Sequence, residues 1–411
     1  MMEGWKEKKI HDFGKVVTGK TPPTKISEYF GEGYAFITPT DLVYDNYYIN
    51  HTARQVTELA RSKFKNYFLP PNSISYTCIG ATVGKSCLNR DYVLTNQQIN
   101  SIIPNEKHDA HFIYYYLNII TPSIVAIAGG AATPIINKSS FEGLKVFIPP
   151  LPTQRKIAKI LSAYDDLIEN NLIRIKLLEE MAQNQFNNWY ANNQDFEEVN
   201  LGSIIGHEIG GGWGAEEQSD EFSKPAYVIR GTDIDELPNG KLEKVPFRFH
   251  KKSNLASRKL QDGDIIFEVS GGSSYEGVAK TLLVTDELLK QFDNAVMPAS
   301  FCKLARPIER KYSSFLFLFW RFLRHIKGTE VFEIRSASNI VNYNWTAFLK
   351  FQKIKKPSEA ELVRFNNKVE PIYKQVYKLG NQNQYLKEAR DILLPRLMTG
   401  MIDVEKLELE L

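Results

Sequence analysis

One long segment, from Pro149 to Tyr190, constrains the fold more than any other part of the chain. Three prolines, at positions 149, 150 and 152, hold its start extended, and no further proline or glycine follows before residue 190. Proline is tolerated at the start of a helix but not inside it, so the sequence predicts a helix that begins just after Pro152. At ~36 residues and ~1.5 Å per residue, this helix would be ~54 Å long and would need a partner along its length.

The apolar residues of this segment recur alternately four and three positions apart, which is the spacing of a coiled-coil seam. A second segment, which begins after Pro357, repeats this spacing. Pro371 lies inside the second segment and predicts a kink or a break there. The first seam comprises Ile157, Leu161, Tyr164, Ile168, Asn171, Ile175, Leu178, Ala182, Gln185 and Trp189, and the second comprises Leu362, Phe365, Val369, Ile372, Val376, Leu379, Asn383, Leu386, Arg390 and Leu393.

Two long helices with matching seams in one chain most simply pack on each other, as an antiparallel pair. Asn171 and Asn383 fall at seam positions. A buried polar residue in a seam lowers stability but fixes the register of the two helices. The alternative is that each asparagine faces solvent where the seam frays.

The regions between the helices form an internal repeat, because short segments occur in the same order in residues 1–150 and 193–355. The two copies are offset by roughly 190 to 205 residues, and such a consistent order indicates a duplicated domain. The matching pairs are residues 9–24 and 199–214, 35–42 and 227–234, 72–86 and 263–280, 95–104 and 293–307, 111–118 and 313–324, and 143–157 and 348–362.

These patterns predict an α+β (mixed) fold class: two α/β globules separated by two long helices packed as an antiparallel coiled coil, with an internal pseudo-repeat. Alternating β-branched and polar residues between Gly, Pro and Asn indicate short strands, and residues 111–120 indicate a helix. The loop of small residues at 129–140 precedes a strand at 143–150. The expected domains are 1–150, 151–192 for the first helix, 193–355, 356–400 for the second helix, and an acidic tail at 401–411.

The composition is that of a globular protein, with 43% hydrophobic and 24% charged residues in 411. At this length two domains are expected. The longest apolar runs are about half the ~20 residues that span a bilayer, and residues 1–14 contain no hydrophobic signal core. Three cysteines, Cys78, Cys87 and Cys302, do not indicate a disulfide framework. We therefore expect a cytoplasmic protein without a membrane partner.

Catalytic and cofactor motifs are incomplete. The sequence IGATVGKS at 79–86 has three residues between its glycines, whereas a phosphate loop needs four, and the residues after it indicate a strand. The cysteines lack a second metal-ligand pair, and no HExxH is present. Asp264 and Glu268 are not followed by the Glu-x-Lys of a nuclease, and no Asn-Pro-Pro-aromatic segment of an amino-methyltransferase occurs. The sequence predicts a non-catalytic chain with no metal and no cofactor.

Three motifs resemble a known family. PPLPTQR at 149–155, followed by Ile157 and Leu161, is similar to a family motif PPLxEQ-x-x-I-x-x-x-L; LLPRLMTG at 393–400 and TGKTP at 18–22 also match. These motifs resemble the specificity (S) subunit of type I restriction-modification enzymes over essentially the whole chain. Thr153 stands where that family usually has Glu, and residues 356–359 of the second copy lack the double proline and the Gln.

The resemblance implies that each globule is a target-recognition domain that reads one half of a bipartite, asymmetric site in double-stranded DNA. The helices would set the spacing and dock two modification subunits, which supply S-adenosylmethionine-dependent adenine methylation. Restriction subunits would supply ATP-dependent translocation and cleavage, so the specificity subunit itself would not be an enzyme. The residues implied in partner binding are Gln154, Arg155, Ile157, Leu161, Leu394, Leu397 and Met398.

Base edges are read mainly by Arg, Lys, Asn and Gln, and phosphates are commonly held by Ser, Thr and backbone amides. On this basis we expect DNA contacts from loops of both globules. The candidates are Thr18, Gly19, Lys20, Thr21, Thr82, Lys85, Asn96, Gln97, Gln98, Thr133 and Lys138 in the first globule, and Trp213, Arg230, Lys251, Lys252, Ser270, Ser273, Ser274, Ser336, Ser338, Asn339 and Asn342 in the second.

Several of these features have a second interpretation. The basic stretches 54–65 and 241–259 suit phosphate contacts but could be solvated faces. Thr40–Asp41 and Thr232–Asp233 could form turns rather than read bases. The aromatic residues 114–116 and 315–319 could stack on bases or pack in a core. Alternative functions are bipartite DNA recognition in another methylation-only or phage-defence system, a nuclease or methyltransferase with an unrecognised site, and a coiled-coil interaction protein.

Overall fold

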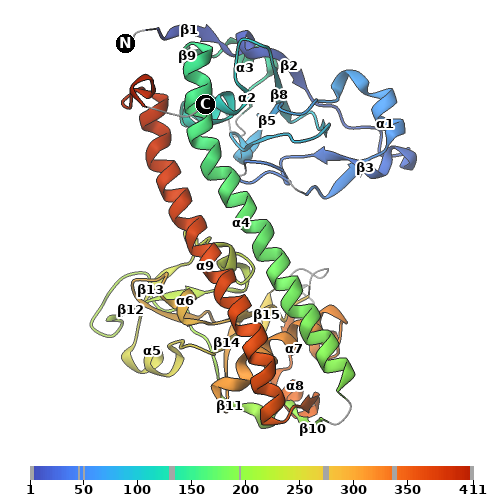
Figure 1. Cartoon of the computed structure of the whole chain (residues 1–411), viewed down its shortest axis with the longest axis vertical. Helices are drawn as coiled ribbons and strands as arrows, with labels where there is room; N and C mark the ends of the chain where they lie inside the picture. The colour runs from blue at the N-terminus through green and yellow to red at the C-terminus, as the bar shows by residue number, and fades with distance from the viewer. Residues whose placement is uncertain are drawn as a thin grey trace. The chain divides into compact units, whose positions relative to one another are not determined.

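The computed structural model describes residues 4–44, 47–49, 51–128, 135–193, 196–271, 277–335 and 340–407. The chain divides into two compact units. Unit 1 comprises Met1–Asp166 and Lys387–Leu411, and unit 2 comprises Leu167–Leu386. Each unit contains one α/β globule and adjoining parts of the two long helices, α4 (Leu151–Asn192) and α9 (Glu359–Met398) (Figure 1).

The globule of unit 1 is built on three small sheets. A four-stranded antiparallel sheet has the order β2-β8-β5-β6, a three-stranded sheet has the order β4-β3-β7, and β1 pairs antiparallel with β9. The elements are β1 (Lys6–Lys9), β2 (Gly14–Thr18), β3 (Phe30–Ile37), β4 (Arg54–Val56), α1 (Glu58–Lys63), β5 (Ile74–Thr77), β6 (Ser86–Leu88), β7 (Leu94–Thr95), β8 (Ile99–Pro104), α2 (Ala110–Ala128), α3 (Lys138–Gly143) and β9 (Lys145–Ile148).

The globule of unit 2 repeats this topology. Its sheets have the orders β11-β18-β14-β16, β13-β12-β17 and β10-β21, which correspond strand for strand to those of unit 1. The parallel pairing of β3 with β7 recurs between β12 and β17. The elements are β10 (Glu197–Asn200), β11 (Ile205–Gly210), β12 (Lys224–Ile229), β13 (Phe247–His250), α5 (Lys252–Arg258), β14 (Ile265–Glu268), β16 (Thr281–Leu283), α6 (Asp286–Leu289), β17 (Ala295–Pro298), β18 (Cys302–Pro307), α7 (Ser313–His325), α8 (Trp345–Phe351) and β21 (Lys353–Lys356).

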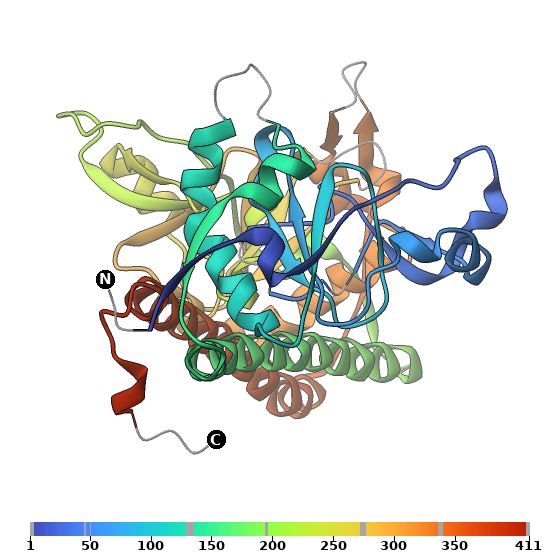
Figure 2. The same ribbon diagram turned by 90° about the horizontal axis from the view of Figure 1, so that it is seen from above.

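The internal repeat expected from the sequence is therefore confirmed. Unit 2 also contains a three-stranded sheet of order β15-β20-β19, formed by β15 (Ser270–Gly271), β20 (Val341–Tyr343) and β19 (Glu333–Arg335). In Figure 2, β19 and β20 (orange arrows) lie on the side of their globule away from α9.

The long helices pair antiparallel within each unit, as expected. In unit 1, Arg390 of α9 donates a hydrogen bond to Asp165 of α4. In unit 2, the rings of Trp189 and Phe365 stack with centroids 4.3 Å apart. The residue number thus rises along α4 as it falls along α9. The coiled-coil seam explains this pairing, because ten of its twenty members are apolar residues that are buried in the structure: Ile157, Leu161, Ile175, Ala182, Leu362, Phe365, Val369, Ile372, Val376 and Leu379.

Two features of the helices differ in detail from the prediction. The first helix begins at Leu151 rather than after Pro152, which occupies the first turn, where a proline N–H is not needed. Of the kink or break predicted at Pro371, the break is absent, since α9 runs unbroken from Glu359 to Met398. Pro371 lies on the exposed face of α9, where water can satisfy the carbonyl that its missing N–H leaves without a donor.

Both cores include side chains from the long helices. In unit 1, Ile157 and Leu161 of α4 and Leu397 and Met398 of α9 pack with the aromatic face of α2. In unit 2, α7 supplies the centre of the core, where Trp320 packs edge-to-face on Phe267 with centroids 5.2 Å apart. The aromatic residues 114–116 and 315–319 are buried, so their packing interpretation is the correct one.

The segment 135–140 differs from the predicted loop. Lys138 begins α3, and Asn137 caps this helix by accepting a hydrogen bond from the backbone N–H of Ser140 at 2.8 Å. The three cysteines are buried free thiols. Among the described helices, none combines the length and the hydropathy needed to cross a bilayer.

Candidate functional site

A glycine turn after β2 forms the centre of a polar surface cluster in unit 1. The backbone N–H of Gly19 donates to the carbonyl of Ile99 at 3.0 Å, and that of Lys20 donates to the carbonyl of Thr95 at 2.8 Å. A Cβ atom on Gly19 would lie 2.2 Å from the carbonyl oxygen of Asn96. Only glycine therefore allows this turn to lie against the loop between β7 and β8.

The side chains of this turn and this loop are linked. Thr21 Oγ1 donates to Gln97 Oε1 at 2.7 Å, and Asn96 Nδ2 donates to Gln98 Oε1 at 3.0 Å. Lys20 is exposed, with its ammonium 5.2 Å from the centroid of the Tyr67 ring. We name this set the first turn cluster. It consists of Thr18, Gly19, Lys20, Thr21, Asn96, Gln97 and Gln98, all of which the sequence predicted as candidates.

An equivalent turn follows β11 in unit 2. The backbone N–H of Gly211 donates to the carbonyl of Cys302 at 2.9 Å, and that of Gly212 donates to Pro298 at 3.0 Å. A Cβ atom on Gly211 would lie 2.1 Å from the carbonyl oxygen of Ala299. Beside it, the Arg248 guanidinium lies 5.0 Å from the centroid of the half-exposed Trp213 ring.

These matching hydrogen bonds identify two residues that the sequence reasoning missed. In unit 1, Ile99 N donates to Asn96 O at 3.2 Å and closes a turn with Gln97 and Gln98 at its centre. In unit 2, Cys302 N donates to Ala299 O at 2.8 Å and closes the same turn around Ser300 and Phe301. We name the second turn cluster as the set Gly211, Gly212, Trp213, Arg248, Ser300 and Phe301. The alignment of residues 95–104 with 293–307 could have identified Ser300 and Phe301 as the counterparts of Gln97 and Gln98.

The hairpin between β5 and β6 is a second candidate in unit 1. Thr82 Oγ1 donates to the carbonyl of Ile79 at 2.8 Å within its own turn, and Lys85 lies 5.8 Å from the ring centroid of Tyr44. Strand β6 follows directly, whereas a phosphate loop is followed by a helix.

The other two candidates of unit 1 lie outside this hairpin. Lys138 lies at the start of α3, with its ammonium 3.6 Å from the Glu142 carboxylate. Thr133 lies outside the described residues.

Arg230 in unit 2 is held by its own chain. Its guanidinium makes two hydrogen bonds to the buried Asp233 carboxylate, at 3.0 and 2.8 Å, and a third to the carbonyl of Lys244 at 2.8 Å. The bond to Asp233 raises the pKa of Arg230. Asp41 has the same position in unit 1, where it accepts from the Thr38 backbone N–H at 2.8 Å. The recurring Thr-Asp pairs thus belong to a turn scaffold, and Arg230 is part of it.

Of the remaining candidates of unit 2, Ser270 adjoins the second turn cluster, because its backbone N–H donates to the carbonyl of Phe301 at 3.2 Å. Lys251 pairs with Glu221, and Lys252 begins α5 with an exposed side chain. Ser270 Oγ donates to Asn342 Oδ1 at 2.7 Å, where β15 pairs with β20. Five candidates lie outside the described residues: Ser273, Ser274, Ser336, Ser338 and Asn339.

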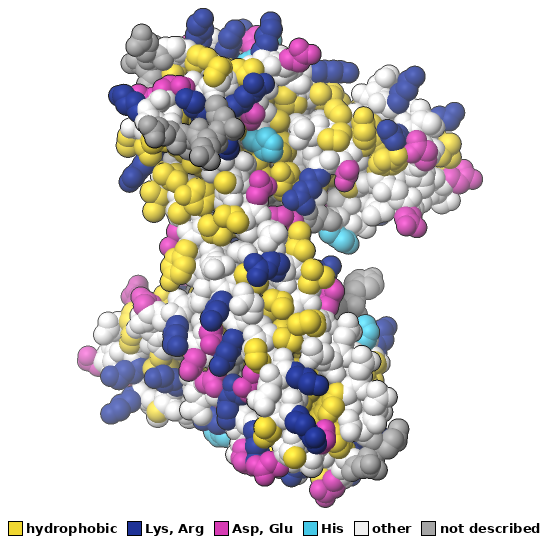
Figure 3. Space-filling view, in the orientation of Figure 1, with side chains coloured by type: hydrophobic (Ala, Val, Ile, Leu, Met, Phe, Trp, Pro, Cys, Tyr) yellow, Lys and Arg dark blue, Asp and Glu magenta, His cyan; other side chains and the backbone are white. Residues whose placement is uncertain are grey.

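The cations of the two basic stretches contact acids and aromatic rings of their own globules. In the stretch 241–259, Lys241 pairs with Glu236 at 2.6 Å and Arg248 pairs with Glu216 at 3.0 Å. Figure 3 shows Lys and Arg (dark blue) interleaved with Asp and Glu (magenta) over unit 2. In the stretch 54–65, Arg61 lies over two aromatic rings, those of Tyr34 at 4.8 Å and Tyr92 at 4.5 Å, and is 3.7 Å from Glu58. Both stretches therefore hold cations against acids and aromatic rings of the same globule.

Asp264 and Glu268, the carboxylates considered as part of a nuclease motif, are buried in unit 2. Asp264 is fully buried and accepts two hydrogen bonds from Arg306, at 2.7 and 2.9 Å. Glu268 ends β14 and is buried, and this burial raises its pKa. Among the described residues, no group of three His, Cys, Asp or Glu side chains is placed to hold a metal ion.

Most residues predicted to bind partners face the interior of unit 1. Gln154 is 1% exposed, donates to the carbonyl of Pro149 at 2.9 Å and accepts from the backbone N–H of Asp109 at 3.1 Å. Ile157, Leu161, Leu397 and Met398 belong to the core. Arg155 is exposed and Leu394 is partly exposed. Apolar side chains outside the seam are accessible on α4, namely Leu167, Ile173, Leu177 and Met181, and on α9, namely Val363, Tyr385 and Ile392.

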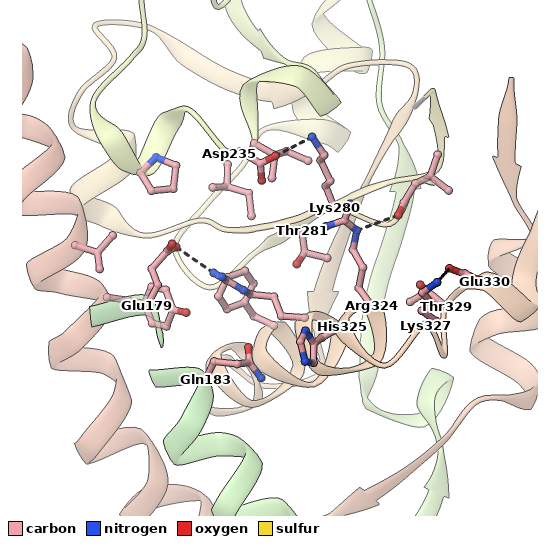
Figure 4. Close-up of a pocket in the computed structure, with 18 of the residues that line it drawn as sticks. Glu179, Gln183, Asp235, Lys280, Thr281, Arg324, His325, Lys327, Thr329 and Glu330 are labelled. Carbon is pink, nitrogen blue, oxygen red and sulfur yellow. Dashed lines mark hydrogen bonds and ion pairs between the residues drawn. The ribbon is translucent and has the colours of Figure 1, made fainter. Parts of the chain in front are cut away.

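A polar pocket of about 520 Å³ lies in unit 2 between α4, α7, α9 and β16 (Figure 4). Its cations face acids or carbonyls: Arg321 pairs with Glu179 at 3.0 Å, and Lys280 pairs with Asp235 at 2.7 Å. The buried oxygen Oε1 of Gln183 receives no hydrogen bond from the described residues. Because the charges are balanced, the pocket has the character of a water-holding cavity that joins α4 to α7.

The fold and the two turn clusters define a class of protein: a tandem repeat of one α/β globule, with different exposed side chains on the same turn, built onto an antiparallel coiled coil. Comparisons with known proteins agree with this class. Residues 2–180 match the family model described as "Type I restriction modification DNA specificity domain".

The chain is also similar to known proteins over nearly its whole length. It is 29% identical to the type I restriction enzyme MjaIX specificity subunit of Methanocaldococcus jannaschii, with 98% of this chain and 94% of that protein covered. It is 29% identical to the HindI specificity subunit of Haemophilus influenzae over 43% of this chain and 39% of that protein. The crystal structure of a type I restriction-modification S subunit from M. genitalium has the same fold, with a TM-score of 0.53, 15% identity and 96% of each chain covered. The chain is therefore similar to type I restriction-modification specificity subunits, over residues 2–180 by the family model and over nearly its whole length by the Methanocaldococcus jannaschii relative.

Proposed function

We propose that each globule reads one half of a bipartite, asymmetric site in double-stranded DNA, and that the long helices set the gap and dock modification subunits. The observation that carries this proposal is the pair of turn clusters. The same backbone hydrogen bonds and the same crowded glycine occur in both globules, while the exposed side chains differ. A framework that is kept while its surface residues change is suited to reading two different sequences.

In the first globule, the chemistry of the turn cluster suits direct reading of base edges. Gln97 and Gln98 are exposed amides on a turn whose backbone is fixed. Asn and Gln can make paired hydrogen bonds to adenine in the major groove, and an exposed Lys can contact guanine or phosphate. Lys20 supplies that charge beside the amides. The half-site read by this globule is therefore expected to contain adenine.

The second globule presents different chemistry at the same positions, which supports an asymmetric site. Ser300 and Phe301 stand in place of the amides Gln97 and Gln98. Gly212 and Trp213 stand in place of Lys20 and Thr21, and Arg248 supplies the charge. A symmetric dimer would read two copies of one half-site. Two unlike globules in one chain remove that restriction.

The long helices support a spacing and docking role. They pair antiparallel and carry accessible apolar side chains outside their seam, such as Leu177 and Ile392. Exposed apolar side chains grouped on a helix face are typical of protein interfaces. We assign the modification subunits to these faces; they would supply the S-adenosylmethionine chemistry, and restriction subunits would supply the ATP-dependent steps. The specificity chain itself would only bind and position DNA.

Exchange of one globule tests the half-site assignment. The full chain would be produced together with its modification subunits in cells, and the methylated sites would be read by methylation sequencing. Replacing residues 10–145 with the corresponding segment of another specificity subunit should change one half of the site and leave the other half and the gap unchanged. A change in both halves would contradict modular reading.

Lengthening the helices tests the spacing role. Inserting four residues into each helix adds ~6 Å, somewhat under two base pairs at ~3.4 Å each. The gap in the methylated site should grow while both half-sites stay the same. The matched control inserts four residues into α4 alone, which should disrupt the pairing of the helices and abolish methylation. An unchanged gap in the doubly lengthened chain would show that the helices do not set it.

Two further measurements separate this function from its alternatives. The purified chain, incubated with DNA and either Mg²⁺ or S-adenosylmethionine, should show no turnover, and any turnover would support an enzyme. The complex with modification subunits should bind duplex DNA with an affinity that falls steeply as salt rises, because phosphate contacts release counterions. Absence of that salt dependence would support a coiled-coil interaction protein without a nucleic-acid role.

A further inference from the structure

We propose that Phe301 reads the C5-methyl group of a thymine in the half-site of the second globule. This inference rests on the proposed function, because it assigns one base contact within it. Phe301 is 65% exposed and lies at the centre of the turn that corresponds to Gln97 and Gln98 in the first globule.

The turn that carries Phe301 is fixed on both sides. Ala299 N donates to the carbonyl of Ile229 at 2.8 Å, and Ala299 and Cys302 are buried. The carbonyl of Phe301 itself accepts from the backbone N–H groups of Val269, at 2.9 Å, and Ser270, at 3.2 Å. Only Ser300 and Phe301 project from this turn. The phenyl ring is therefore presented by a rigid support.

A single exposed phenylalanine is not unusual on a protein surface. The position of Phe301 distinguishes it from others, because the equivalent turn of the first globule carries exposed amides. Three kinds of backbone hydrogen bond hold both turns. One comes from the glycine turn, one closes the turn itself, and one joins it to a neighbouring strand; in the first globule this last bond runs from Asn96 N to the Ile37 carbonyl of β3 at 3.0 Å. If two globules on one framework read different bases, the residues that project from this turn are the ones that should differ.

The apolar character of the phenyl ring determines which part of a base pair it can recognise. A phenyl group offers no hydrogen bond, so it cannot distinguish the donors and acceptors of base edges. The feature of a base pair in the major groove that an apolar group can recognise is the thymine methyl. Ser300, next to Phe301, can bond to a base edge or a phosphate. The second half-site is thus expected to contain an A·T pair at the position that faces Phe301.

Replacement of thymine by uracil, which lacks only the methyl group, tests this contact directly. The full chain assembled with its modification subunits would be titrated with duplexes that carry uracil at each thymine in turn. Uracil at one position of the second half-site should weaken binding by ~4-fold, which is the effect expected for the loss of one buried methyl group. Phe301→Ala should bind the thymine and uracil duplexes equally at that position, whereas uracil in the first half-site should affect both proteins alike.

A second variant guards against loss of folding. Phe301→Leu retains an apolar side chain and should keep part of the preference for thymine, and Phe301→Gln should lose it while still assembling with the modification subunits. Phe351→Ala, at an exposed phenylalanine of α8 outside the turn clusters, should leave the preference at the second half-site intact. If Phe301→Ala keeps the full thymine preference on an intact bipartite site, or if the second half-site contains no A·T pair, this inference is overturned and the proposed function stands. A wild-type complex that recognises no bipartite site would instead contradict the proposed function.

Discussion

Asn171 Nδ2 donates a hydrogen bond to Asn383 Oδ1 at 3.0 Å inside the seam of the coiled coil in unit 2. Both side chains are buried, at 6% and 5% exposure. The sequence placed both asparagines in the seam but left open whether they met or faced solvent. Because they meet, a shift of one heptad would leave two buried amides opposite apolar side chains, so this pair selects one register of the helices.

Replacing one member of this pair should cost more than replacing both. Asn171→Leu leaves the Asn383 amide buried without this partner, and we expect a loss of ~1–3 kcal/mol in the free energy of unfolding. The double variant Asn171→Leu/Asn383→Leu should regain most of that loss. Thermal unfolding followed by circular dichroism measures both effects, with Asn188→Leu at an exposed position of α4 as control. Equal losses in the single and double variants would show that the pair does not act as a unit.

A buried ion pair fixes the helices in unit 1. Asp165 accepts hydrogen bonds from Arg390 and from the Tyr115 hydroxyl, and its side chain is 3% exposed. Asp165→Leu removes the buried carboxylate that pairs with Arg390, and should cost ~3–5 kcal/mol. Asp165→Leu/Arg390→Leu should cost clearly less. Hydrogen exchange of the amides in α2 reports the stability of unit 1, and Asp391→Leu provides the control with a small expected effect.

His250 should make unit 2 less stable in mild acid. It is 1% exposed, and its ring nitrogens have no hydrogen-bond partner among the described residues. Burial, and then the charge of Arg258, lowers the pKa of His250 below its ordinary value of 6.5. As the pH falls below that value, the unfolded chain takes up a proton before the folded chain does, so stability decreases.

The measurement for His250 is the melting temperature of unit 2 at pH values from 7.5 down to 5.5. His250→Leu should show a smaller decrease over this range than the wild type does. His51→Leu, at an exposed position of unit 1, is the matched control and should follow the wild type. An identical slope for His250→Leu would rule out this histidine as the cause.

The crowded glycines should be the positions where a single methyl group disrupts DNA reading. In Gly19→Ala and Gly211→Ala the new Cβ would lie 2.2 and 2.1 Å from a carbonyl oxygen, so the turn must move, at a cost of ~1–3 kcal/mol. Each variant should weaken recognition of its own half-site about tenfold or more, the effect of ~1.4 kcal/mol. Binding to duplexes with one altered half-site separates the two effects. Gly210→Ala, with no atom within 4 Å of the new Cβ, should bind like the wild type.

Thr153 of α4 links this helix to the residues that follow α9. Thr153 Oγ1 donates to Glu405 Oε1 at 2.9 Å, and Lys156 pairs with the same carboxylate at 2.6 Å. Thr153→Glu should repel Glu405 and release the short turn 404–406, seen as faster hydrogen exchange there. Thr153→Gln should have little effect, and Glu405→Gln should reverse the effect of Thr153→Glu. Unchanged exchange in Thr153→Glu would exclude this contact as the tether.

Side-chain periodicity and the order of segments were enough to predict most of the fold. The seam predicted both helices because apolar spacing directly reflects which face is buried, and the repeat predicted that the two globules share one topology. The unbroken α9 was not predictable from Pro371 alone, since the effect of an interior proline depends on whether its face of the helix meets solvent.

The site was predicted less completely, because its residues meet only in three dimensions. The first turn cluster was identified from TGKT and NQQ, but their mutual contact depends on tertiary pairing of β2 with β8. Gln154 was expected to face a partner, whereas its amide bonds to Pro149 and Asp109 within unit 1. Arg230 was expected to contact DNA, although an acid three residues later was a sign of local pairing. Phe301, for which we propose a base contact, was not among the sequence candidates, most of which are polar.

Unit 1 combines residues 1–166 with residues 387–411, and unit 2 is continuous from 167 to 386. This division has a consequence for biosynthesis. The core of unit 1 includes Leu397, Met398 and Val404, so it cannot close until the ribosome has synthesised the whole of unit 2. The part of the chain that is made first therefore completes its core only after the rest of the chain has been made.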